Sequence, residues 1–228
     1  MRILALDTAT ESCSAALWID GNVLQRGAEF ERGHAGRILV MVDELLREAA
    51  VGLPTLDAIA FGRGPGSFTG VRLAASVTQG LAFGADLPVV GISDLRAVAQ
   101  RASRGSGAAT RTLVCNDARM QEVYWGCFES AADGLMAPIA EERVGKPATV
   151  RLPDDWSGTV HGAGRGFAAY EELRDALRER LAGIDDRILP HAAEVAILAA
   201  PEVRAGRVVA PEQAIPVYLR DDVARAKS

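Results

Sequence analysis

The segment FGRGPGSFTGVR, from Phe61 to Arg72, constrains the fold more than any other part of the sequence. Its glycines and proline lie between an apolar run that predicts a buried strand and a longer apolar run, Val71–Ala85, that predicts a helix. The N-terminal N–H groups of such a helix could bind an anion. No GxxxxGK[ST] pattern is present, however, and we favour a tight strand-to-helix turn with Ser67 or Thr69 as the helix cap.

The order of the apolar patterns predicts an α/β protein made of two related lobes. A stretch of small and polar residues, Ser103–Thr110, is the candidate boundary between an N-terminal lobe of residues 1–103 and a smaller C-terminal lobe of residues 104–228. Strands are expected at Ile3–Leu6, Ser12–Ile19, Val23–Phe30, Leu56–Gly62, Pro88–Ser93, Thr112–Asn116, Glu122–Ser130, Leu135–Val144 and Thr159–Gly162. Helices are expected at Gly33–Ala50, Val71–Ala85, Asp94–Ala102, Phe167–Leu181 and Ala192–Ala199.

Composition argues against several classes of function. The formal net charge is −5, so the chain is a poor candidate for binding RNA alone, which requires clustered Lys and Arg. The widely spaced Cys13, Cys115 and Cys127 form neither a zinc motif nor a disulfide framework. The N-terminal residues contain no long apolar run, so we expect no signal peptide, no membrane association and a cytoplasmic location.

Three short segments occur in the order of an actin-like nucleotide site. A carboxylate ends the first predicted strand, a second follows the strand near residue 113, and a pair of glycines follows near residue 162. We treat these segments as a candidate vestigial nucleotide site. Its residues are Asp7, Thr8, Asp117, Gly162 and Gly164.

The second of these segments is incomplete as a phosphate loop. A working loop is expected to carry glycine soon after Asp117, because phosphate approaches the backbone closely, but Ala118 and Arg119 follow. The three histidines, at positions 34, 161 and 191, also lack the spacing of a metal site. We therefore expect no metal, no cofactor and no independent catalysis.

The two longest helices of the first lobe predict a contact surface. Val71–Ala85 is apolar on nearly all sides, so it is either deep in the core or covered by another subunit. Val40 lies among polar residues of the preceding helix, which favours the second interpretation. We expect the helices to pack side by side, with Ile38, Leu45 and Leu46 turned inward. The outward flank would carry Arg37, Val40, Met41, Glu44, Arg72, Ser76, Gln79 and Phe83.

Several segments together resemble the TsaB family, also called YeaZ. They are ILALDTATESCSAAL, GHAGRILVMVDELL, GPGSFTGVRLAASVTQGLAFG, LPVVGIS, DARMQEVYWG and PVYLRDDVA, and they span nearly the whole chain. The loop-helix block and the PVYLR tail are the most specific. The resemblance implies an actin-like (ASKHA) α/β fold of two lobes with a reduced C-terminal lobe.

The resemblance also implies a function. TsaB proteins are non-catalytic subunits of the bacterial machinery that places threonylcarbamoyl on a tRNA adenosine (t6A). They bind the transferase TsaD through the N-terminal lobe, the ATPase TsaE joins them, and tRNA is reached through the complex. TsaD carries an HxxxH metal pair on the helix that matches Gly33–Ala50, where this chain has only His34 followed by Ile38. Without TsaD, the apolar helix pair could also form a homodimer.

Two enzyme classes remain as alternatives. An actin-like ATP-dependent phosphotransferase would need Asp7 and an intact second phosphate loop, which Ala118 and Arg119 argue against. A metallopeptidase-like enzyme would need a pair of metal ligands, which the histidine spacing does not supply.

Overall fold

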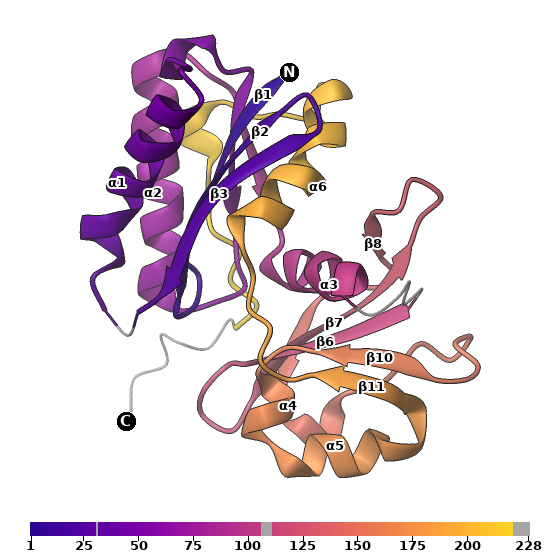
Figure 1. Cartoon of the computed structure of the whole chain (residues 1–228). Coiled ribbons are helices and arrows are strands. Elements are labelled where there is room, and N and C mark those ends of the chain that lie inside the picture. The colour runs from indigo at the N-terminus through magenta and orange to yellow at the C-terminus, as the bar shows by residue number, and fades with distance from the viewer. Residues whose placement is uncertain (31, 106–110, 221–228) are drawn as a thin grey trace.

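Two β-sheets, each with its own helices, form the described part of the chain (Figure 1). The computed structural model describes residues 1–30, 32–105 and 111–220. The first sheet has the strand order β3-β2-β1-β4-β5, antiparallel across β1, β2 and β3 and parallel across β1, β4 and β5. Its strands are β1 (Arg2–Asp7), β2 (Ser12–Ile19), β3 (Asn22–Glu29), β4 (Ala58–Gly62) and β5 (Val89–Ile92).

Three helices cover the two faces of the first sheet. Helices α1 (His34–Glu48) and α2 (Phe68–Ala85) lie on one face, where the inward stripe of α1 is buried at Ile38 and Leu45. Helix α6 (Ala192–Arg204) packs on the other face, against β1 and β2. The predicted inward stripe of α1 is therefore confirmed at its centre.

The second sheet has the order β11-β10-β6-β7-β8, and β9 pairs with β7. Its strands are β6 (Arg111–Asp117), β7 (Val123–Ser130), β8 (Met136–Pro138), β9 (Arg143–Gly145), β10 (Val160–Ala163) and β11 (Leu181–Asp185). Helices α3 (Asp94–Gly105), α4 (Gly166–Ala169) and α5 (Glu171–Leu177) accompany this sheet. Short 3-10 turns lie at Leu53–Thr55, Pro147–Thr149, Arg178–Arg180 and Pro211–Gln213.

The chain crosses from the first sheet to the second and back again. Although α6 lies within residues 104–228, it packs on the first sheet (Figure 1), and its buried alanines share a core with β1 and β2. The division into lobes of residues 1–103 and 104–228 stays a prediction, and residues 106–110 of its boundary lie outside the described residues.

Two predicted elements of the second half are wrong. The expected strand Leu135–Val144 is two strands, because Phe128 pairs with Pro138 whereas Trp125 pairs with Arg143, so the register on β7 shifts by two residues between β8 and β9. The expected helix Phe167–Leu181 breaks at Tyr170, whose backbone is extended, and ends before the unpredicted strand β11.

Three further boundaries differ from those expected by three residues or more. Helix α2 begins at Phe68, three residues before the expected Val71, because Ser67 caps it. Helix α3 continues to Gly105 beyond the expected Ala102. Helix α6 continues through Pro201 to Arg204, beyond the expected Ala199. Among the described residues, no helix combines the length and the apolar character that crossing a membrane requires.

A histidine caps the N-terminus of helix α6 where the helix meets the first sheet. His191 Nδ1 accepts a hydrogen bond from the Ala193 N–H (3.2 Å), and the Ala192 N–H donates to Ser14 Oγ (2.9 Å). Burial, with a smaller contribution from the charge of Arg101, lowers the pKa of His191 to about 4. The folded protein therefore holds this imidazole neutral at pH values where the unfolded chain protonates it.

This difference predicts a loss of stability in mild acid. Because the folded pKa lies below the unfolded value of 6.5, stability falls as the pH drops from about 6.5 towards 4. Between pH 7 and pH 5, the wild-type chain should lose up to roughly 2 kcal/mol more than His191→Asn, which retains a capping side chain but does not titrate. Urea unfolding of both chains at each pH measures this difference. All other titrating groups are the same in the two chains, so their contributions cancel. Equal acid-induced losses would contradict the prediction.

Candidate functional site

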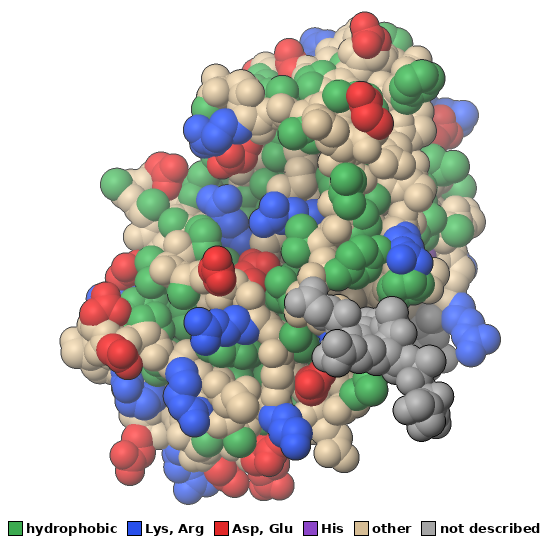
Figure 2. Space-filling view, turned by 180° about the vertical axis from the view of Figure 1, so that it is seen from behind, with side chains coloured by type: hydrophobic (Ala, Val, Ile, Leu, Met, Phe, Trp, Pro, Cys, Tyr) green, Lys and Arg blue, Asp and Glu red, His purple; other side chains and the backbone are tan. Residues whose placement is uncertain are grey.

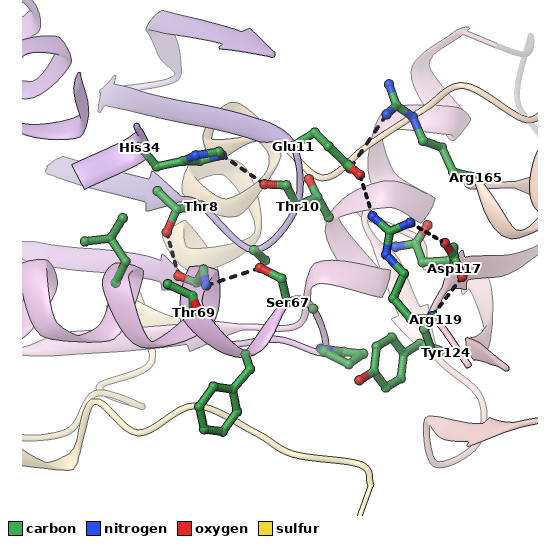
Figure 3. A pocket seen from close by; sticks show the side chains of 18 of the residues that line it. Thr8, Thr10, Glu11, His34, Ser67, Thr69, Asp117, Arg119, Tyr124 and Arg165 are labelled. Carbon is green, nitrogen blue, oxygen red and sulfur yellow. Dashed lines mark hydrogen bonds and ion pairs between the residues drawn. The ribbon is translucent and has the colours of Figure 1, made fainter. Parts of the chain in front are cut away.

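A cleft of about 1180 Å³ lies between the two sheets (Figure 3). The turn after β1, the first residues of α1 and the loop before α2 line its first-lobe side. The loop after β6 and Arg165 line the other side, and the tail segment Val217–Arg220 borders both, because Tyr218 accepts from Arg72 and Arg220 pairs with Glu122. Figure 3 shows Thr8, Ser67 and Thr69 facing this space from one side, with Asp117 and Arg119 opposite.

The glycine-rich loop is packed tightly against the turn that follows β1. The Ser67 N–H donates to the Ala9 carbonyl (2.7 Å), and Thr8 Oγ1 donates to the Gly70 carbonyl (2.7 Å). A Cβ atom on Gly70 would lie 2.1 Å from the Thr8 carbonyl oxygen, so the contact requires glycine. Ser67 Oγ accepts from the Gly70 N–H (3.2 Å), which confirms the capped strand-to-helix turn.

The structure brings only part of the candidate nucleotide site together. Thr8 and Asp117 line the cleft. Asp7 is fully buried behind it, and Gly162 and Gly164 are not among the lining residues. Gly164 has a φ of +103°, and a Cβ atom there would lie 2.5 Å from the Cys115 carbonyl oxygen, so it has a packing role.

Arg119 fills the position where a second phosphate loop would approach a nucleotide. Its guanidinium lies 3.2 Å from Asp117 and 3.2 Å from Glu11, which follows β1 in the other lobe. Arg165 lies 3.6 Å from the same glutamate and 2.5 Å from Glu29. These pairs form an ionic bridge across the cleft (Figure 3). Sequence reasoning identified Arg119 as an obstruction but missed its acidic partners, which are distant in the chain.

The turn that carries Arg119 has an unusual backbone. Arg119, Met120 and Gln121 have φ values of 61°, 54° and 61°, in the left-handed region where glycine is favoured. The turn therefore carries three bulky side chains, whereas a glycine-containing loop would leave its backbone accessible to a ligand. The Met120 side chain is 79% exposed.

The start of α1 does not assemble metal ligands. His34 Nε2 lies 3.0 Å from the Thr10 carbonyl oxygen, and Ile38, four residues later, is fully buried in the first core. Among the residues that the structure describes, no group of three or more His, Cys, Asp or Glu side chains is placed to hold a metal ion.

Helices α1 and α2 lie side by side (Figure 1), and both carry exposed apolar side chains. Val40 is 54% exposed and Phe83 is 80% exposed, so neither belongs to the core. Leu39 is 50% exposed and lies on the outward side, at the edge of the buried α1 stripe. Phe68, absent from the predicted set, is 53% exposed at the start of α2.

The other residues of the predicted flank differ in exposure. Glu44, Arg37, Arg72 and Ser76 are exposed, whereas Met41 and Gln79 are half-buried. We call the outward side of the two helices, centred on Val40 and Phe83, the α1/α2 face. The predicted flank as a contact surface stays a prediction.

Arginines border the α1/α2 face. The Arg37 guanidinium lies 4.1 Å from the centre of the Phe30 ring, and that of Arg72 lies 3.4 Å from the Phe68 ring. Arg72 Nε also donates to the Tyr218 hydroxyl (2.8 Å), so the C-terminal tail runs beside this face. Cations held over aromatic rings keep their charge exposed around an apolar centre.

The comparisons with known proteins give consistent matches. A family described as TsaD, tRNA N6-adenosine threonylcarbamoyltransferase, matches residues 28–228. The chain is 43% identical over 235 residues to the tRNA threonylcarbamoyladenosine biosynthesis protein TsaB of Escherichia coli, an alignment that covers 100% of this chain and 98% of the relative.

Two solved structures from Pseudomonas aeruginosa are similar over 96% of this chain and 99% of their own. One, described as YeaZ, has a TM-score of 0.85 and 45% identity. The other, described as an uncharacterized protein with similarity to the peptidase YeaZ, has a TM-score of 0.89 and 47% identity.

Adding a methyl group at two glycines of α2 should have opposite effects. Gly70→Ala places Cβ against the Thr8 carbonyl and should destabilise the fold by about 2 kcal/mol, the usual cost of overpacking. Gly80→Ala, whose Cβ would meet no atom beyond the neighbouring backbone of its own helix within 4 Å, should instead stabilise α2 by roughly 0.5–1 kcal/mol. Thermal unfolding of both variants measures the contrast. A Gly70→Ala chain as stable as Gly80→Ala would show that the loop can move away from the β1 turn.

Proposed function

The chain belongs to the TsaB (YeaZ) family, and we propose that it is a non-catalytic subunit of the t6A modification machinery, which binds and supports the transferase TsaD. Its relatives are named for tRNA threonylcarbamoyladenosine biosynthesis. The family match and the two-sheet architecture confirm the expected actin-like α/β fold of two lobes. We propose the non-catalytic role and the individual partners in addition.

The exposed α1/α2 face carries the proposal. A Phe side chain that is 80% exposed leaves most of its apolar surface in water, where burial would contribute roughly 2 kcal/mol. Val40 and Leu39 add apolar surface on the neighbouring helix. An apolar centre with a charged border is the usual composition of a protein–protein interface.

The match to the TsaD family suggests how the two subunits could meet. Because residues 28–228 fit that family, both α1 and α2 have counterparts in the proposed partner. Two related folds can pair through equivalent helices about an approximate two-fold axis, as identical subunits do about a true one. The same geometry would allow a homodimer of this chain when TsaD is absent.

The obstructed cleft supports a role without chemistry of its own. Arg119 is paired with Asp117 on the side where a phosphate would bind, and Asp7 is buried away from the cleft. A histidine pair of the TsaD type would need a second histidine four residues after His34. That position is Ile38, which is aliphatic and buried in the core. An ATP-dependent phosphotransferase remains the alternative, since Thr8 and Asp117 still line a cleft of sufficient size.

We place tRNA contact largely on the other subunits. The chain is acidic overall, and basic and acidic side chains are interspersed over the face seen in Figure 2. Tight binding of RNA phosphates requires basic side chains that act together. TsaE and tRNA are therefore proposed to join through the complex, in the cytoplasm.

A single charge on the α1/α2 face should abolish binding to TsaD. Phe83→Glu or Val40→Glu would bury an unpaired carboxylate in the interface. Each should weaken binding by about 30-fold or more, because the loss of one central contact already has an effect of that size. Ile184→Glu is the matched control, because this exposed aliphatic lies on β11 of the other lobe. Size-exclusion chromatography with purified TsaD measures binding, and circular dichroism checks the fold.

Reconstituted tRNA modification separates this proposal from its alternatives. Modification should require the wild-type chain and fail with Phe83→Glu. Normal complex formation by both face variants would place the interface elsewhere. Failure of the wild-type chain to bind TsaD at all would refute the proposed function itself.

The isolated chain should not turn over ATP. With Mg²⁺ present, steady-state hydrolysis should stay at the level of the buffer, because Arg119 stands beside Asp117 and no second phosphate loop is free. Calorimetric titration with ATP–Mg²⁺ gives a second readout. Steady turnover that Asp117→Asn abolishes would establish the phosphotransferase alternative.

A further inference from the structure

Two aspartates meet in the interior beneath the glycine-rich loop. Asp7 ends β1 and Asp94 begins α3, and both side chains are fully buried. Gly62, at the end of β4, lies between them. A Cβ atom on this glycine would be 2.4 Å from Asp94 Oδ1 and 2.9 Å from Asp7 Oδ2, so the two carboxyl groups converge on the same small space.

Each carboxyl group uses one oxygen for a backbone N–H. Asp7 Oδ1 accepts from the Ala9 N–H (2.9 Å), and Asp94 Oδ2 accepts from the Gly64 N–H. The remaining oxygens, Asp7 Oδ2 and Asp94 Oδ1, have no other partner. Two ionised carboxylates in this position would be desolvated, unpaired and mutually repulsive.

A proton fits this space better than a metal ion does. Even a methyl carbon on Gly62 would collide with both oxygens, so the space is already filled. A bound Ca²⁺ or Mg²⁺ needs about six oxygen ligands, and the described side chains supply only these two aspartates here. One proton between the two oxygens turns a repulsive contact into a hydrogen bond.

The surroundings favour retention of that proton. Burial raises the pKa of Asp94 well above its usual value, and the charge of Asp7 raises it further. Burial also raises the pKa of Asp7, against the hydrogen bonds from Asp94 and Ala9 and the nearby His34. Glu142 is the other charged group that faces Asp94, and its negative charge acts in the same direction as that of Asp7.

We propose that Asp7 and Asp94 share one proton, and that this acid pair fastens the glycine-rich loop to the first sheet. Gly64 is held from both sides, since its carbonyl accepts from the Asp94 N–H (3.0 Å) while its own N–H donates to the Asp94 carboxyl. The inference goes beyond the proposed function, because it assigns Asp7 to a positioning role in the interior and not to a nucleotide.

Asparagine substitutions test the pair through a distinctive pattern. In Asp94→Asn, the amide oxygen can accept from Gly64 while the NH₂ group donates to Asp7; Asp7→Asn can form the mirror arrangement. Each single variant should therefore fold and match or exceed the wild type in urea midpoint at pH 7. The double variant should unfold at a lower urea concentration than either single, because two NH₂ groups then face each other.

The pH dependence gives a second readout. Because the folded acid pair holds a proton that the unfolded chain releases, the contribution of this pair to wild-type stability should fall as the pH rises above about 4, the usual aspartate range. The advantage of Asp94→Asn over the wild type should therefore grow from pH 5 upward until the pair deprotonates. Asp86→Asn, at an exposed aspartate, is the control and should follow the wild type.

Infrared spectroscopy detects the proton directly. Wild-type protein at pH 7 should show the C=O stretch of a protonated carboxylic acid, and Asp94→Asn should remove it. Absence of this band in the wild type would overturn the proposal. So would a double variant as stable as the two singles, or single variants that are destabilised equally at every pH.

Discussion

The contact between the glycine-rich loop and the turn after β1 orders the rest of the first lobe. The Ser67 N–H binds the Ala9 carbonyl, and Thr8 binds the Gly70 carbonyl, so the loop follows the turn closely over four residues. This contact sets where α2 begins and how it lies on the sheet, since Ser67 is also its cap. Phe83 lies near the far end of the same helix and is 80% exposed.

The cleft brings charged side chains of the two lobes together. In an actin-like protein the loops after the first strands of both lobes would converge on a nucleotide. Here Glu11 and Arg119 reach across the same space and pair at 3.2 Å. Both side chains are partly exposed, so the pair contributes at most about 1 kcal/mol, and its effect lies in occupying the cleft.

The strands and helices of the first lobe were predictable from the sequence because their apolar runs and turn residues are local signals. The boundaries of Ser12–Ile19 follow directly from its apolar run and the Asp20–Asn22 turn. The second lobe was less predictable, since β11 and the split between β8 and β9 depend on pairing with distant strands. Local periodicity does not determine such pairing, and tertiary contacts override it.

The residues of the candidate surfaces also differ in whether the sequence could indicate them. Val40 and Phe83 could be singled out because each is apolar within a polar helical flank, a property visible in one helix. Tyr218, however, lies 146 residues from Arg72, to which it binds, and no local pattern indicates that contact.

The tail also explains why the α1/α2 face can stay apolar without deforming the chain. Gln79 donates to the Ala214 carbonyl (3.2 Å), and the Val217 N–H donates to the Arg63 carbonyl (2.7 Å), so the tail is fastened along α2. The first of these bonds engages Gln79, which was predicted on the outward flank of α2, so the tail covers part of that flank. The exposed apolar side chains are thus carried by a helix that is fixed on its sheet side by the core and on its flank by the tail. A surface held in this way needs little rearrangement when another subunit covers it, which lowers the entropic cost of association.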